Sequence, residues 1–126
     1  MVTAANQRFP YRLDRVADAV VLRLDGTHYH ADSFDALRQA LEEAGSSAAG
    51  GRVVVDLGKV VLISSTVLRV FRAAHLALAE RGGALHVAGG GELVANVLKF
   101  APFIRRYETV DEAAAGFGAA RGEENR

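Results

Sequence analysis

Apolar and polar residues alternate along residues 11–24, which predicts two short strands joined by a tight turn. The apolar side chains of the second strand share one face: Val20, Leu22 and Leu24. Val21 and Arg23 lie on the opposite face, because successive side chains of a strand point to opposite sides. We therefore expect a hairpin with one buried face.

The apolar pattern changes to a helical period in residues 31–45. Four apolar residues form one stripe of the expected helix: Phe34, Leu37, Leu41 and Ala44. Asp32 or Ser33 is the expected N-cap, since short polar side chains can accept a bond from the free N–H groups there. Gly45 is the expected C-terminal stop.

A second helix is predicted over residues 66–80, which are apolar on nearly every side. Arg69, Arg72 and His75 form a narrow polar stripe at three-residue spacing, and two glycines follow the helix. We expect most of this helix to be covered by the rest of the domain.

Continuous apolar runs at residues 52–57 and 84–88 predict parallel strands that are covered on both faces. A glycine triplet, residues 89–91, then turns the chain into a third helix. The expected inner face of that helix consists of Leu93, Val94, Val97 and Leu98.

A short last strand is expected within residues 103–109, followed by a helix with a capping box formed by Thr109 and Glu112. The element order is therefore β-β-α-β-α-β-α-β-α, which predicts an α/β fold with a mixed sheet of about five strands and four helices. We expect one domain over residues 1–126, with flexible tails at about 1–10 and 118–126.

Composition narrows the classes of function. Lys and Arg together number 15, and Asp and Glu together also number 15. The chain therefore has no net positive charge that would favour binding to nucleic acid or to an anionic membrane. The chain has no cysteine, which excludes disulfides and thiolate metal sites and favours a reducing compartment. Neither a signal peptide nor a membrane-spanning segment is apparent, so we expect a cytoplasmic protein without direct membrane insertion.

Three hydroxyl residues, Ser64, Ser65 and Thr66, stand between an apolar run and the second helix. One serine can be the helix N-cap. A catalytic serine would need a glycine-flanked elbow and a nearby histidine, and no glycine opens this turn, so we expect no enzyme. The third interpretation is a phosphate acceptor, because the free N–H groups of a helix start tolerate added negative charge.

Neither a metal nor a cofactor is expected. His28 and His30 could supply two metal ligands, but the sequence offers no clear third. Residues 87–94, VAGGGELV, lack the spacing and the lysine of phosphate-binding loops, which favours a plain strand-to-helix turn.

Residues 53–90, VVVDLGKVVLISSTVLRVFRAAHLALAERGGALHVAGG, resemble the STAS domain family, specifically the bacterial anti-sigma factor antagonists. The matching positions are Asp56-Leu57, Val60, Leu62-Ile63, Ser65-Thr66, Leu68, Gly82-Gly83, Leu85 and Val87. The likeness extends over about residues 20–115, and it implies the same element order as the apolar pattern.

The resemblance implies a non-enzymatic switch in transcription. Such a module binds an anti-sigma factor that is itself a serine kinase, and the sigma factor is released. Phosphorylation breaks the complex, and a metal-dependent serine phosphatase restores it. Carried over by alignment, the acceptor is Ser65, with Ser64 and Thr66 as alternatives. The expected docking face is the loop after Gly26, the helix start and the arginine stripe: His28, Tyr29, His30, Ser64, Ser65, Thr66, Val67, Arg69 and Arg72.

The family's G-x-x-D motif near the first helix reads Gly26-Thr27-His28-Tyr29, so an expected acidic contact is absent. Two further positions depart from the family pattern. Ser64 replaces an aspartate, and Val67 replaces a glycine and would place a branched side chain where a partner lies. In an alternative function, Ser64 and Val67 are adaptations to permanent contact with other subunits of a complex. The chain would then be a non-phosphorylated structural subunit of a signalling scaffold or of a lipid-transport complex. A third class of function, that of a hydrolase, requires a histidine within hydrogen-bond reach of Ser65.

Overall fold

A computed structural model describes residues 11–124 of the chain, and its side chains as far as residue 117. Residues 1–10 and 125–126, which belong to the predicted tails, lie outside this part. The elements between residues 11 and 124 are β1 (Tyr11–Val16), β2 (Ala19–Leu24), β3 (His28–Tyr29), a short 3₁₀ turn η1 (Ala31–Ser33), α2 (Phe34–Ser47), β4 (Arg52–Asp56), β5 (Leu62–Ile63), α3 (Ser65–Glu80), β6 (Ala84–Ala88), α4 (Gly91–Leu98), β7 (Arg105–Tyr107) and α5 (Val110–Glu124).

The main sheet has the strand order β1-β2-β4-β6-β7. Strand β1 runs antiparallel to β2, and the other neighbours are parallel. The mixed α/β fold and the order of its helices and main-sheet strands are therefore as predicted. A separate parallel pair, β3 with β5, was not predicted, because each of its strands has only two residues.

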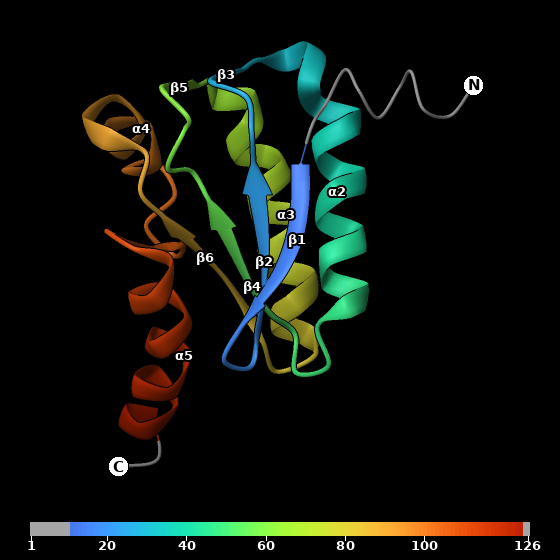
Figure 1. Ribbon diagram of the computed structural model, residues 1–126, viewed down its shortest axis with the longest axis vertical. Coiled ribbons are helices and arrows are strands. Elements are labelled where there is room, and N and C mark those ends of the chain that lie inside the picture. The colour runs from blue at the N-terminus through green and yellow to red at the C-terminus, as the bar shows by residue number, and fades with distance from the viewer. Residues whose placement is uncertain (1–10, 125–126) are drawn as a thin grey trace.

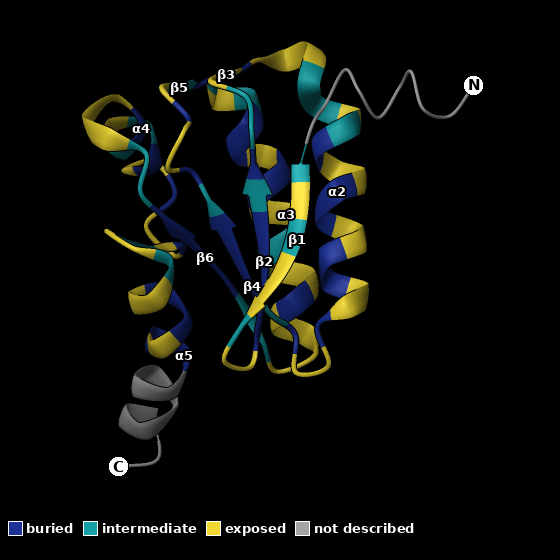
Figure 2. Ribbon diagram, in the orientation of Figure 1, coloured by how far each residue is buried: buried dark blue, intermediate teal, exposed yellow. Residues whose placement is uncertain are grey.

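Helices cover the main sheet on both faces, as Figure 1 shows. The larger apolar cluster joins the sheet to α2 and α3, and the smaller one joins the other face to α5. Val21 belongs to the smaller cluster and is fully buried. The prediction of a single buried face is thus wrong for β2, since α5 covers its second side. Strand β1 lies at the sheet edge and remains largely exposed (Figure 2).

Two predicted helix details are wrong. Gly45 does not end α2, which continues to Ser47; it is buried within the helix, where Leu78 of α3 packs against it. Leu93 points outward from α4, whose buried residues are Val94 and Leu98. The glycine turn before α4 is confirmed, and all three glycines have positive φ angles.

Helix α3 begins at Ser65 and is less covered than predicted. Its inner face carries Val67, Val70 and Phe71 into the core, whereas the opposite face is open to solvent. Leu76 on that open face is 51% exposed. No helix of the described part of the chain combines the length and the apolar character that a membrane crossing requires.

Candidate functional site

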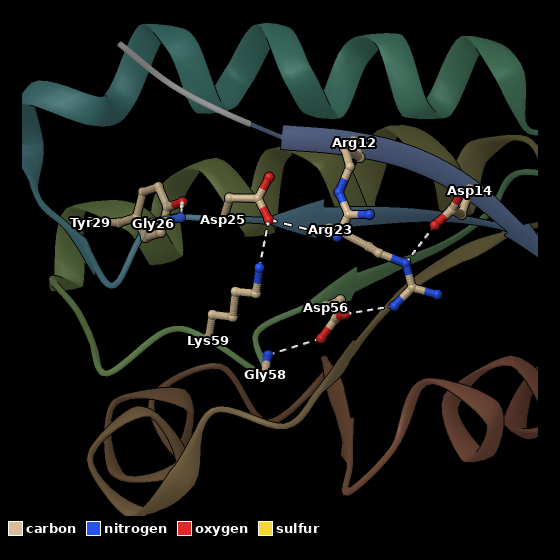
Figure 3. A network of polar contacts seen from close by, with 9 residues as sticks. All are labelled: Arg12, Asp14, Arg23, Asp25, Gly26, Tyr29, Asp56, Gly58 and Lys59. Carbon is tan, nitrogen blue, oxygen red and sulfur yellow. Dashed lines mark hydrogen bonds and ion pairs between the residues drawn. The ribbon is translucent and has the colours of Figure 1, made fainter. Parts of the chain in front are cut away.

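The candidate site lies where the parallel strands β2, β4 and β6 end, because the chain from β4 to α3 crosses this edge of the sheet. Asp56 closes β4 and fixes the turn that follows. Its carboxylate accepts hydrogen bonds from the Gly58 N–H (2.9 Å) and from the Arg23 guanidinium (2.8 Å). Figure 3 shows that Arg23 also contacts Asp14 of β1, at 2.6 Å. Asp56 thus positions the site rather than lining it.

Both carboxylates stabilise the charged form of Arg23. The hydrogen bond to Asp14 is the largest cause that raises the pKa of Arg23, and the bond to Asp56 adds to it. A third carboxylate, Asp25, contacts Lys59 at 3.2 Å and Arg12 at 3.7 Å (Figure 3). These pairs tie β1 and the end of β2 to the turn before β5, and no sequence motif indicated them.

Backbone hydrogen bonds hold the loop after Gly26 against the start of α3. The carbonyl oxygen of Thr27 accepts bonds from the N–H groups of Val61 (2.7 Å) and Leu62 (3.1 Å). The Ser64 N–H donates to the carbonyl oxygen of Tyr29 at 3.0 Å. The structure therefore brings residues 27–30 and the hydroxyl residues together, as the predicted docking face requires.

Side chains alternate along residues 28–30, as expected for a strand. Tyr29 points inward and is only 3% exposed, and its hydroxyl accepts a hydrogen bond from the Gly26 N–H at 2.8 Å. Burial raises the pKa of this hydroxyl. His28 and His30 are exposed, and their rings stack with centroids 6.2 Å apart. The prediction that Tyr29 contacts a partner is wrong, because the ring belongs to the core.

The three hydroxyl residues have different environments. Ser64 occupies the N-cap position, but its Oγ is buried and has no hydrogen-bond partner within the described residues. Ser65 is exposed on the first turn of α3, and Thr66 is half-buried. Ser65 is therefore the hydroxyl most open to an external molecule.

Val67 cannot contact a docked partner, contrary to the prediction. Its side chain is 1% exposed and lies in the main core. The reason is helical phase, since Val67 shares the inner face of α3 with Val70 and Phe71.

Arg69 and Arg72 are exposed on the same side of α3 as Ser65, four and seven residues further along. Within the described residues, neither guanidinium forms an ion pair or a hydrogen bond with another side chain. His75 does not continue this stripe: its Nδ1 accepts a bond from the Leu85 N–H at 3.2 Å, and its ring lies against Phe103. Burial lowers the pKa of His75.

The geometry gives no support to a catalytic serine. In the described part of the chain, His28, His75 and His86 form their hydrogen bonds with Thr27, Leu85 and Ala113, and none bonds Ser65. Nor do the described residues contain a group of three side chains suited to hold a metal ion. What the arrangement offers is an accessible hydroxyl at a helix N-terminus with two cationic side chains on the following turns.

A comparison with protein families gives a clear match. The family model described as "Mlab, STAS domain" matches residues 11–103. No curated protein sequence matches the chain significantly.

Several solved structures share the fold. A STAS domain protein from Planctomyces limnophilus has a TM-score of 0.77 at 17% identity, over 86% of this chain and 97% of that one. An anti-sigma factor antagonist from Mycobacterium paratuberculosis has a TM-score of 0.74 at 19% identity, over 86% and 93%. The antagonist SpoIIAA of Bacillus, in its unphosphorylated form, has a TM-score of 0.66 at 18% identity, over 90% and 97%. At these identities the likeness shows the fold alone.

Proposed function

Because this chain belongs to the STAS domain family, we propose that it is an anti-sigma factor antagonist, a non-enzymatic protein that binds an anti-sigma factor and thereby releases a sigma factor. The observation that carries the proposal is the exposed Ser65 on the first turn of α3. The structural neighbours named as anti-sigma factor antagonists support it.

The proposed docking face combines residues from two distant parts of the sequence. His28 and His30 come from the β3 segment, and Ser65, Arg69 and Arg72 come from α3. Ser64 and Thr66 lie at its edge and contribute backbone more than side chain, because both are partly covered. The pairing of β3 with β5 holds the two parts in register.

The proposed switch is phosphorylation of Ser65 by the anti-sigma factor, acting as a serine kinase. A phosphate adds nearly two negative charges at pH 7. The free N–H groups and the dipole at the start of α3 stabilise that charge, and Arg69 is close enough along the helix to pair with it. Phosphorylation thus leaves the domain folded while charge and bulk oppose docking. A metal-dependent serine phosphatase would reverse the step, and the exchange would take place in the cytoplasm.

Mass spectrometry after incubation with a candidate anti-sigma factor kinase from the same genome and ATP tests this switch. The expected result is a gain of about 80 Da that peptide mapping assigns to Ser65, and its loss in Ser65→Ala. Ser47→Ala, which removes an exposed serine of α2, is the matched control and should still gain the mass. A gain that persists in Ser65→Ala would contradict the assignment.

A structural subunit remains the second candidate, and one observation favours it. Several large apolar side chains are exposed outside the hydroxyl region: Leu76, Leu93, Phe100 and Phe103. Phe100 is 82% exposed. Permanent interfaces are richer in apolar side chains than transient ones, so these four residues are candidate contacts of a structural subunit. Unchanged mass after kinase treatment, together with tight association with a partner, would favour this role over the switch.

A further inference from the structure

A groove of about 490 Å³ lies between the outward faces of α2 and α3. The centre of its α3 wall consists of Ala73, Ala74 and Ala77, and these short side chains leave the space between the helices open. The apolar floor comes from both helices, including Leu41 of α2 and Val70 of α3. Its volume lies within the range of small-molecule sites, roughly 300–1,000 Å³.

The rim of this groove is mainly cationic. Arg38, Arg69 and Arg81 line it, against the single carboxylate of Glu42. Arg38 contacts Glu42 at 3.1 Å, so these two charges largely neutralise each other. Arg81 donates to the carbonyl oxygens of residues 45 and 48, at 2.9 and 2.8 Å.

Arg69 differs from the other two rim arginines. Among the described residues no carboxylate or carbonyl group pairs with its guanidinium, so it is the cation most available to a ligand. It stands at the α3 N-terminal end of the groove, and Arg81 stands at the other end. The lining therefore extends for about 18 Å along α3, at 1.5 Å per residue.

We propose that this groove binds a single-chain amphiphile with an anionic head group, of which a fatty acid is the simplest example. The acyl chain lies along Ala73 and Ala77, and the carboxylate pairs with Arg69. A guanidinium suits this role because it can bind a carboxylate through two parallel hydrogen bonds. The groove shares Arg69 with the proposed docking face but does not include Ser65, and its existence does not depend on the proposed function.

The concave shape argues for a small molecule rather than a membrane surface. Contact with a bilayer requires apolar side chains that project outward, whereas the apolar floor here is recessed between two helices. The length of the groove and its apolar floor also suit one extended chain better than a compact polar ligand.

Isothermal titration calorimetry with dodecanoate, kept below its micelle-forming concentration, tests the proposal. We expect saturable binding at one site per chain. Dodecyltrimethylammonium has the same chain length and the opposite charge, and it should bind at least tenfold more weakly. Absence of dodecanoate binding, or equal affinity for the two amphiphiles, would overturn the proposal. So would binding only to phosphatidylglycerol vesicles, since that result indicates a membrane surface.

Two matched pairs of variants locate the ligand. Ala77→Leu fills the groove and should weaken dodecanoate binding at least tenfold, while Ala79→Leu, exposed on the same helix outside the lining, should not change it. Arg69→Gln should weaken binding by between about threefold and tenfold. Arg72→Gln, which removes an exposed arginine outside the lining, should have no effect.

Melting temperatures establish that each variant is folded before its affinity is compared. If Ala77→Leu does not fold, the two arginine variants show whether the ligand lies in the groove, because both arginines are at the surface and their substitution should leave the domain folded. Unchanged affinity in Arg69→Gln, or equal losses in the two arginine variants, would contradict the assignment of the carboxylate to Arg69.

Discussion

At the residue scale, the site is determined by which side chains point outward from short, well-anchored segments. Tyr29 and Val67 lie in the core, whereas their neighbours His28, His30 and Ser65 are exposed. The buried side chains hold the segments in place, and the exposed ones are available to a partner. Single buried groups elsewhere also have measurable consequences for stability.

His86 makes the stability of the fold sensitive to acid. It is 3% exposed on β6, its ring stacks on Phe117 with centroids 3.8 Å apart, and its Nδ1 donates to the carbonyl oxygen of Ala113. Burial is the main cause that lowers the pKa of His86 below the ordinary 6.5. Below that pH the unfolded chain binds a proton that the folded chain does not, so stability falls as pH decreases.

Chemical denaturation at pH 7.5 and pH 5.5 measures this effect. Below pH 6.5, we expect this one histidine to lower the free energy of unfolding by up to about 1.4 kcal/mol for each pH unit of acidification. His86→Leu should reduce the slope, and His30→Gln, which removes an exposed imidazole, should not. A slope that is the same in wild type and His86→Leu would contradict this assignment.

Gly83 is required by a close contact between two backbone segments. A Cβ atom at this position would lie 2.0 Å from the carbonyl oxygen of Gly51, which accepts the N–H of Ala84. Gly83→Ala should therefore lower the free energy of unfolding by more than about 3 kcal/mol, because backbone must shift. Gly82→Ala, next to it, has open space around the added methyl group but a positive φ angle of 82°. Gly82→Ala should lower the free energy of unfolding by only about 1 kcal/mol. Equal losses in the two variants would contradict the explanation by the Gly83–Gly51 contact.

At the element scale, the two helix starts of α3 and α5 differ in how their free N–H groups are satisfied. Thr109 Oγ1 accepts the Glu112 N–H at 3.1 Å, and the Glu112 carboxylate accepts the Thr109 N–H at 3.3 Å. This reciprocal capping box was predicted from the sequence and is confirmed. Ser64 has the N-cap position of α3 without a capping bond from its side chain.

Alanine substitution at these two positions tests the difference. Thr109→Ala should lower the free energy of unfolding by about 1 kcal/mol, the usual contribution of a capping side chain. Ser64→Ala should change it by less than about 0.5 kcal/mol, because the hydroxyl that it removes is buried and unpaired. Denaturant melts of both variants give the comparison. A loss in Ser64→Ala as large as that in Thr109→Ala would show that Ser64 does cap α3.

The sequence predicted those elements whose signals are local. Alternation in residues 11–24, the apolar runs of β4 and β6 and the capping box each depend on neighbouring residues, and all were placed correctly. The β3–β5 pair could not be predicted, because two-residue strands carry no period and their partners are far apart in the sequence. The burial of Val67 was predictable in principle, since it has the same helical phase as Phe71.

At the scale of the whole molecule, α3 takes part in both proposed sites. Its first turn carries Ser65 at the edge where β2, β4 and β6 end, and its outer face forms one wall of the groove with α2. The sequence indicated the first site through the hydroxyl residues. The groove depends on how two helices lie side by side, and a stretch of small residues on α3 was the only local sign of it.

The central claim is that an uncharged Ser65 is needed for docking of an anti-sigma factor kinase. The most direct test is the affinity of that kinase for wild type, Ser65→Asp and Ser47→Asp, measured by isothermal titration calorimetry. Ser47→Asp adds the same charge at the far end of α2 and controls for net charge (Figure 1). We predict that Ser65→Asp lowers the affinity by roughly 100-fold or more, with its melting temperature nearly unchanged, while Ser47→Asp binds as wild type does. An affinity of Ser65→Asp within about threefold of wild type would contradict the claim.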